Sequence, residues 1–134
     1  MVRMKHRYFL VRTVCTKKMY KLKITPHVVS EAVKKAVKQL HGDFGLACIS
    51  SSLSVKYYNV YTNLMIIRVL RKFEEKVSSS LAFAFQPLKV SSDKDSNECP
   101  FFLHTLHVSG TIRSAQKVII RWNKRMLSAE HNKN

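Results

Sequence analysis

The sequence is short of acidic residues, glycine and proline. Only eight of its 134 residues are Asp or Glu, against 24 Lys and Arg, so the formal net charge is +16 at pH 7. With three Gly, three Pro and 46% hydrophobic residues, long disordered stretches are not expected. Self-repulsion of so many positive charges opposes folding, and this indicates a polyanionic partner: nucleic acid, an anionic membrane face or an acidic protein.

Long hydrophobic runs are also missing. The best run, residues 64–67, is stopped by Arg68, far short of the roughly 18 residues that span a bilayer. Near the N-terminus, Arg7 and Arg12 flank the short apolar run at residues 8–11, which is not the pattern of a signal peptide. We therefore expect no membrane partner and no signal peptide.

Groups of side chains that perform chemistry are absent as well. Cys15, Cys48 and Cys99 lack the spacing of a zinc site and fit a reducing compartment, cytosol or nucleus. His104 and His107 lie three apart in a predicted strand and should therefore face opposite sides. No carboxylates pair in an apolar setting for acid–base catalysis. We expect no catalytic residue, no metal site and no cofactor bound by the protein.

Strands and helices alternate along the chain. The patterns predict strands at residues 8–15, 53–58, 64–70 and 101–108, and helices at 26–41, 73–81 and 111–127. This order is the split βαβ pattern of ferredoxin-like domains with one helix appended. We predict an α+β sandwich, resembling an RNA-recognition module, with an antiparallel sheet of about four strands. Its helices would cover one face, leaving the other face free for a partner.

One domain is expected to span residues 1–134, with residues 1–7 and 128–134 flexible. Gly42 should end the first helix, and Gly45 should lie where a strand starts. In the second strand, Leu53, Val55 and Tyr57 should share one side. The buried face predicted for the first helix comprises Val29, Ala32, Val33, Ala36, Val37 and Leu40.

Three tyrosines surround the turn after the second strand. Tyr57, Tyr58 and Tyr61 lie beside Lys56 and Asn59, and aromatic rings next to cations can stack nucleobases. Alternatively, Tyr57 belongs to the core and the other two rings cover it. The sequence leaves both interpretations open.

The segment LHVSGTIRSAQKVIIRWNKR, residues 106–125, carries two stripes at helical spacing. The apolar stripe should pack on the core. It comprises Ile112, Ala115, Ile119, Trp122 and Met126. The basic stripe comprises Arg113, Lys117, Arg121, Lys124 and Arg125. No acid precedes Glu130 on this helix, so we predict that the basic stripe binds a phosphate backbone.

Two further groups are predicted to join that contact. Ser109, Gly110 and Thr111 precede the last helix, whose first N–H groups and partial positive charge would form an anion pocket. The N-terminal cations Arg3, Lys5 and Arg7 would add positive charge.

The motif FFLHTLHVSGTIRSAQKVIIRWNKRML, at residues 101–127, closely resembles the C-terminal signature of the Pop-five protein subunit family of eukaryotic ribonuclease P and ribonuclease MRP. MVRMKHRYFL at residues 1–10 is similar to the family's start, and VKYYNVYTNLMIIRVLRKF at residues 55–73 to its central hairpin. The resemblance implies a non-catalytic, RNA-binding subunit in the nucleus and nucleolus. In this family the RNA holds the catalytic Mg²⁺ and removes the 5′ leader of precursor tRNA.

The resemblance also implies partners: the ribonuclease P or MRP RNA, precursor tRNA indirectly, the thirty-kilodalton barrel-type protein subunit and a related small subunit of similar fold. Two features depart from the family. Residues 16–24 are Lys-rich where relatives often carry acids, and the acidic tail of some relatives is missing. A generic RNA-binding or ribosomal protein remains the alternative. The shortage of acids disfavours a free-standing nuclease.

Overall fold

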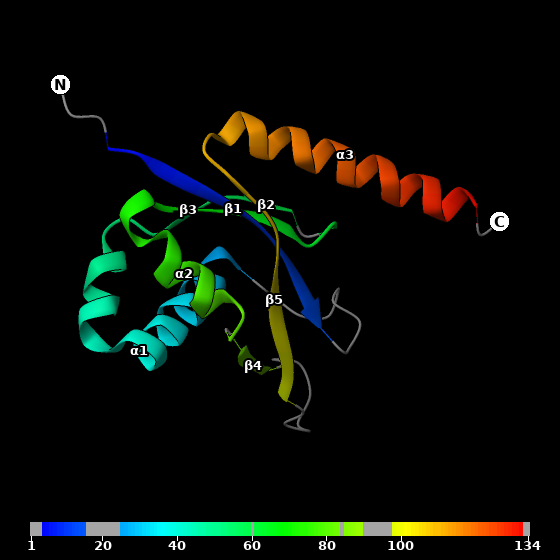
Figure 1. The fold of residues 1–134 in the computed structure, drawn as a ribbon. Helices are drawn as coiled ribbons and strands as arrows, with labels where there is room; N and C mark the ends of the chain where they lie inside the picture. Colours follow the sequence, from blue (N-terminus) through cyan, green and yellow to red (C-terminus); the bar gives the residue numbers. More distant parts are fainter. Residues whose placement is uncertain (1–3, 16–24, 60, 84, 90–97, 133–134) are drawn as a thin grey trace.

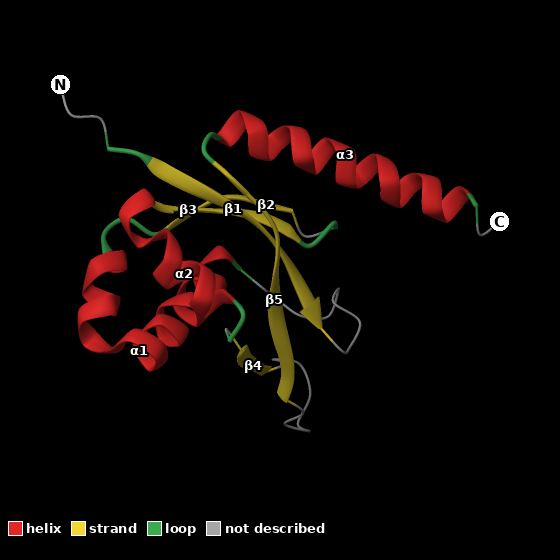
Figure 2. Ribbon diagram, viewed as in Figure 1, coloured by secondary structure: helices red, strands yellow, loops and turns green. Residues whose placement is uncertain are grey.

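The structure is a computed structural model that describes residues 4–15, 25–59, 61–83, 85–89 and 98–132. Figures 1 and 2 show helices on both sides of a twisted sheet. The elements follow one another as β1 (His6–Cys15), α1 (Pro26–Ser50), β2 (Ser54–Asn59), β3 (Leu64–Leu70), the short 3₁₀ helix η2 (Arg71–Phe73), α2 (Glu74–Leu81), β4 (Phe85–Lys89), β5 (Glu98–Ser109) and α3 (Ile112–His131). The predicted α+β, ferredoxin-like order is confirmed.

The described strands form one antiparallel sheet in the order β2-β3-β1-β5-β4. The first four correspond to the predicted strands. The fifth, β4, was not predicted, because Pro87 interrupts a short segment without a clear alternating pattern. Pro87 lies opposite Pro100 at the sheet edge, a position where a residue without an N–H group is tolerated.

Two hydrophobic cores lie on opposite faces of the sheet. Helices α1 and α2 cover the face that carries Phe9 and Val11, and α3 covers the face that carries Leu10. The prediction that the second face is free is therefore wrong, because α3 packs on it. The central strands β1 and β3 are apolar on both sides, as in FLV and LMII, which is the pattern of strands buried on both faces.

Helix α1 bends at Gly42. Thr25 caps its start by accepting a hydrogen bond from the N–H of Val28. Gly42 ends the first straight part, as predicted, with φ of 72°, a backbone angle that favours glycine. The chain then resumes a helix instead of starting a strand. Gly45 is therefore helical, and a Cβ there would lie 2.5 Å from the Cβ of His41.

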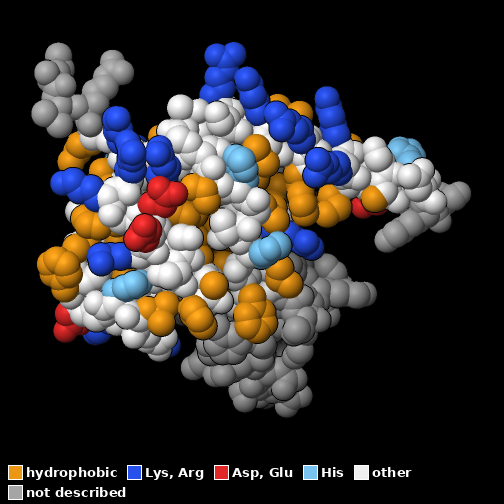
Figure 3. Space-filling view, viewed as in Figure 1, with side chains coloured by type: hydrophobic (Ala, Val, Ile, Leu, Met, Phe, Trp, Pro, Cys, Tyr) orange, Lys and Arg blue, Asp and Glu red, His pale blue; other side chains and the backbone are white. Residues whose placement is uncertain are grey.

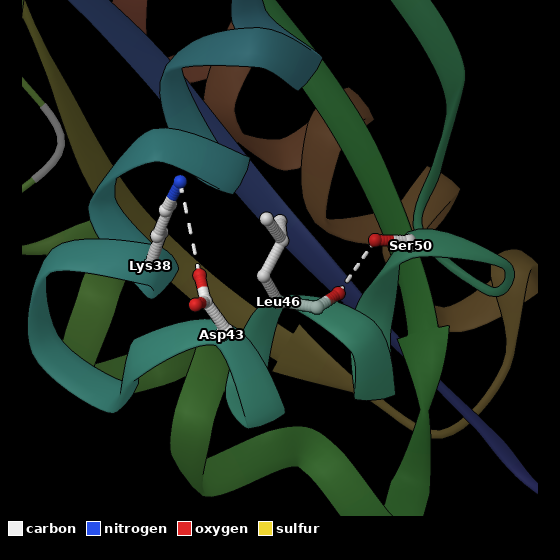
Figure 4. Close-up of polar contacts among 4 residues, drawn as sticks. All are labelled: Lys38, Asp43, Leu46 and Ser50. Carbon is white, nitrogen blue, oxygen red and sulfur yellow. Dashed lines mark hydrogen bonds and ion pairs between the residues drawn. The ribbon is translucent and has the colours of Figure 1, made fainter.

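The bend changes what α1 buries. Figure 4 shows the second part returning alongside the first, with Lys38 Nζ 3.7 Å from Asp43 Oδ1 and the Ser50 hydroxyl bonded to the Leu46 carbonyl. Leu40, predicted to be buried, is 45% exposed beside the bend. The other predicted core positions are confirmed: Val29, Ala32, Val33, Ala36 and Val37.

Two β-bulges reverse side-chain assignments made from alternation. The register of β2 against β3 shifts between Val55 and Tyr57, so that Tyr58 packs against the core and Tyr57 does not. The register of β1 against β5 shifts between Leu10 and Val11, which places His107 opposite Leu10 and His104 opposite Arg12. Because a bulge inserts one residue, these histidines share a face; the prediction of opposite faces is wrong.

The ends of the chain differ from expectation. Strand β1 begins at His6, inside the segment predicted to be flexible, and α3 continues to His131, past its predicted end at residue 127. Arg3 and the Lys-rich residues 16–24 lie outside the described residues. In the part of the chain that the structure describes, no helix is both long and apolar enough to cross a membrane.

Candidate RNA-binding surface

Helix α3 holds the predicted surface in place through its apolar stripe. Ala115 and Ile119 are buried against Leu10, Leu64 and Ile66. Trp122 is half-buried, and the ends of the stripe are more open: Ile112 is 39% and Met126 41% exposed. The core contact is therefore made by the middle of the helix, and it fixes which side of α3 faces outward.

The start of α3 is defined by a cap. The hydroxyl oxygen of Thr111 accepts a hydrogen bond from the N–H of Ser114 at 3.2 Å, and the hydroxyl also donates to the Ser114 hydroxyl. Such a cap satisfies one of the four N–H groups left free at a helix start. The predicted anion pocket therefore has one free N–H group fewer to offer a ligand, because the Thr111 hydroxyl already accepts from Ser114.

All five cations of the basic stripe are exposed: Arg113, Lys117, Arg121, Lys124 and Arg125. Among the described residues, none of them forms an ion pair. Figure 3 shows Lys and Arg side chains following α3 along the surface. The 12 steps from the first to the last correspond to about 18 Å at 1.5 Å per residue. A row of unpaired cations of this length fits several phosphates of one backbone.

The three residues before α3 that were predicted to form the anion pocket differ in their exposure to solvent. Gly110 and Thr111 are exposed, but Ser109 is 5% exposed, and its hydroxyl has no hydrogen-bond partner in the described part of the chain. Ser109 is therefore buried, and its hydroxyl is not exposed to a ligand.

The N-terminal cations have different surroundings. Lys5 is exposed, whereas Arg7 Nε lies 3.3 Å from Glu74 Oε2 in an ion pair between β1 and α2. A Cβ added to Gly110 would lie 3.2 Å from Arg7 Nη1. Arg7 thus connects α2 to the start of α3, and only part of its charge remains for a ligand.

The tyrosines fit neither interpretation fully. Tyr58, not Tyr57, belongs to the core, and burial raises the pKa of its phenol. Tyr57 is 37% exposed and its hydroxyl accepts a hydrogen bond from the side chain of Asn59. The Asn59 side chain also accepts from the N–H groups of Tyr61 and Thr62. Tyr61 is 96% exposed.

A groove separates this turn from the end of α3. The guanidinium carbon of Arg12 lies 5.9 Å from the ring centre of Trp122, a cation–π distance. The groove has a volume of about 440 Å³. It is lined by Arg12, Tyr61, Thr62, Asn63, Trp122, Asn123, Met126, Leu127 and Glu130. Nothing in the local sequence pattern around Arg12 indicates this contact, since its partner is 110 residues away.

Residues that could hold a metal are not gathered within the described ranges. No group of three or more His, Cys, Asp or Glu side chains with metal-binding geometry occurs among them. His104 and His107 share a sheet face and are both exposed, without a third ligand in that part of the chain. The described surface therefore provides positive charge on a helix that is packed against the sheet.

Comparisons with known proteins give the chain's family. A model of the Rpp14/Pop5 family matches residues 7–120. The chain belongs to the Rpp14/Pop5 family. The match begins at Arg7 and ends within α3, so it covers both cores of the fold.

Similar members of the Rpp14/Pop5 family are named as subunits. The chain is 37% identical to the ribonuclease P/MRP protein subunit POP5 of Bos taurus over 127 residues, covering 95% of this chain and 72% of that protein. It is 36% identical to the subunit of that name from Homo sapiens, with 95% and 75% covered. A chain from the cryo-EM structure of yeast ribonuclease MRP has the same fold, with a TM-score of 0.57 and 16% identity over 96% of this chain and 98% of that one.

Proposed function

We propose that this chain is a protein subunit of ribonuclease P or ribonuclease MRP that binds the RNA and does not itself catalyse cleavage. Membership of the Rpp14/Pop5 family over residues 7–120 carries the proposal. The family assignment disfavours the alternative of a generic RNA-binding or ribosomal protein. The unpaired cations of α3 supply the physical means, since Lys and Arg side chains that neutralise phosphates give most of the affinity for a nucleic-acid backbone.

The chemistry would belong to the RNA. In this proposal the RNA holds the Mg²⁺ ions that remove the 5′ leader of precursor tRNA, and the protein binds no cofactor. The chain's own part is to hold RNA segments in place. Arg113, Lys117 and Arg121 would contact phosphates from the exposed side of α3, while Ala115 and Ile119 keep the helix on the sheet.

We further propose that the chain assembles with other protein subunits in the nucleus and nucleolus. The proposed partners are the thirty-kilodalton barrel-type subunit and the related small subunit of similar fold, with precursor tRNA as an indirect partner. Exposed apolar side chains are available for such contacts, among them Phe44, Phe83 and Leu127, which are 76%, 67% and 59% exposed. Aromatic side chains such as the two phenylalanines are enriched at protein interfaces.

Affinity purification from cells, followed by sequencing of the bound RNA, tests the proposal. Ribonuclease P or MRP RNA should be enriched over ribosomal and messenger RNA. Enrichment of ribosomal RNA alone would support the alternative. The purified chain, incubated with precursor tRNA and Mg²⁺ and shown to be free of RNA, should release no 5′ leader; specific cleavage would contradict the non-catalytic role.

A further inference from the structure

A second group of cations lies at the end of the sheet where β1 begins and β3 ends. It consists of Lys5, Arg68, Arg71 and Lys72, and we call it the sheet-end surface. Lys5, Arg71 and Lys72 are exposed, and Arg68 is half-buried. Figure 3 shows Lys and Arg side chains gathered over the start of β1, apart from those that follow α3, with acidic side chains beside them.

Backbone pairing brings Lys5 and Arg71 together. The N–H of Arg71 donates to the carbonyl of Lys5 at 2.9 Å, one step beyond the pair His6 and Leu70. Residues 5 and 71 therefore continue the β1–β3 ladder past its last strand pair, although they are 66 positions apart in the sequence. Lys72 follows directly in η2.

Arg68 lies on the face of the sheet that α3 covers. Ser109, Tyr8, Arg68 and Ser54 lie opposite one another in a row across β5, β1, β3 and β2. Residues directly opposite in a sheet share a face, and Tyr8 packs with the core beneath α3. Arg68 is thus on the α3 side, two strands from Ser109, the last residue of β5, or about 10 Å at about 4.8 Å per strand.

The charges of this surface are not neutralised by the acids nearby. Glu74 is engaged with Arg7 at 3.3 Å. Lys5, Arg68, Arg71 and Lys72 form no ion pair within the described residues, and Arg68 Nε is buried without a hydrogen-bond partner there. A buried donor left without a partner is unfavourable, so an acceptor that reaches Arg68 would be favoured. Glu75, in the first turn of α2, is exposed and forms no ion pair within the described residues.

We propose that the sheet-end surface is a second phosphate-binding site for the same RNA, so that the backbone continues from the exposed face of α3 past Gly110 to Arg68, Arg71 and Lys72. The inference rests on the proposed function, because it takes RNA as the polyanion. Arginine suits such a position because its planar guanidinium donates in parallel to phosphate oxygens.

The hollow on α1 provides a matched control. It is lined by Glu31, Lys34, Lys35, Lys38, Leu46 and Ser50 and has a volume of about 410 Å³. Its lysines are interrupted by acids: Glu31 lines the hollow, and Lys38 is paired with Asp43, as Figure 4 shows. Reversing two charges there changes the net charge of the protein as much as reversing two at the sheet end.

The test compares five proteins, each with all 134 residues, on one RNA, which is recovered with the chain from cells and transcribed in vitro. They are the wild type, the sheet-end variant Arg71→Glu/Lys72→Glu, the single variant Arg68→Gln, the α3 variant Arg113→Glu/Arg121→Glu and the control Lys35→Glu/Lys38→Glu. Filter binding with Mg²⁺ gives affinity, and hydroxyl-radical footprinting gives the protected nucleotides. The sheet-end variant should bind about tenfold more weakly or worse. It should also lose protections at nucleotides other than those that the α3 variant loses. The control should stay within about twofold of wild type.

The outcomes separate this inference from the proposed function. If the wild type does not bind the RNA, the proposed function fails. If the wild type binds and the α3 variant is weakened, but the sheet-end variant binds and protects like wild type, only the second site is refuted. Equal weakening by the control would also refute it, since net charge would then explain the effect. Arg68→Gln should lose the same protections as the sheet-end variant, and thermal melts show whether each variant is folded.

Discussion

The guanidinium of Arg7 lies over Gly110, so close that a Cβ on the glycine would stand 3.2 Å from Nη1. Arg7 is held there from the other side by Glu74, whose Oε2 is 3.3 Å from Nε. One side chain of β1 therefore pairs with α2 and lies against the turn before α3. The glycine leaves the space that the arginine needs.

Gly110→Ala should therefore interact with changes at Arg7. The φ angle of Gly110 is not positive, so alanine is allowed and would restrict the unfolded chain, a stabilising effect of about 0.4–1 kcal/mol. In the wild type this gain should be offset as the guanidinium moves and its partly exposed ion pair, worth up to about 1 kcal/mol, weakens. In an Arg7→Ala background the gain should appear in full. Urea unfolding of the four proteins gives the coupling energy; a value of zero would mean that the contact has no energetic weight.

The exposed and buried sides of α3 should respond differently to substitution. Arg113→Glu/Arg121→Glu should fold like wild type, because both side chains are exposed and an acid in the first helical turn interacts favourably with the helix dipole. RNA affinity should nevertheless fall about tenfold or more, since phosphate contacts are lost and repulsion is added. Circular dichroism melts and RNA titrations measure the two effects.

Ile119→Ala changes the buried side of α3 and is compared with the arginine variant on the exposed side. Ile119 is 7% exposed, and such a truncation costs about 2–5 kcal/mol, a large share of a small domain's stability. This variant should bind RNA poorly only under conditions where it is unfolded. Trp122→Ala should cost less than a fully buried tryptophan would, because Trp122 is half-buried. If the arginine variant melts as early as the Ile119 variant, the faces of α3 have been assigned wrongly.

Binding of RNA should weaken steeply with salt. Each phosphate that a cation neutralises contributes about −0.7 to −0.9 to the slope of log K against log salt concentration. The five cations of α3 therefore predict a slope of about −3 to −5, and contacts at the sheet end would make it steeper. Titrations between about 0.05 and 0.2 M salt provide the slope. A slope near zero would show that the positive charge serves another purpose.

Stability should decline in alkali partly through Tyr58. Burial raises the pKa of its phenol above the ordinary value of 10.0. The folded protein therefore resists ionisation more than the unfolded chain does. The protonated phenol therefore contributes to the free energy of unfolding. That contribution is fully present below about pH 10 and is lost as the pH rises from there through the higher pKa of the folded state.

Tyr58→Phe should remove that part of the alkaline loss while leaving stability at neutral pH close to wild type. Chemical unfolding measured from pH 8 to pH 11 would test this. Tyr61→Phe, which changes a ring that is 96% exposed, is the control and should follow the wild-type curve. If Tyr58→Phe lost as much stability in alkali as the wild type does, the burial of Tyr58 would have no part in that loss.

Local patterns were enough for much of the fold. The runs in β1 and β3, the cap and proline at the start of α1, and the two stripes of α3 each lie within one element. In α3 the periodicity reports directly on which residues are buried, because a helix repeats every 3.6 residues. For the same reason, Ala115 and Ile119 could be assigned to the core and the five cations of α3 to the surface.

Contacts between distant segments could not be read in this way. A bulge has no local signature in β2 or β5, yet it decided which tyrosine is buried and placed His104 and His107 on one face. The pairing of β4 at the sheet edge, the docking of α3 on the second face and the row from Ser109 to Arg68 likewise depend on strands that meet across the sheet. The sequence by itself determined four of the five described strands, the three α-helices, the positive charge and the faces of α3. Only the tertiary structure decided which cations lie together, because strand register is set by pairing between residues far apart in the chain.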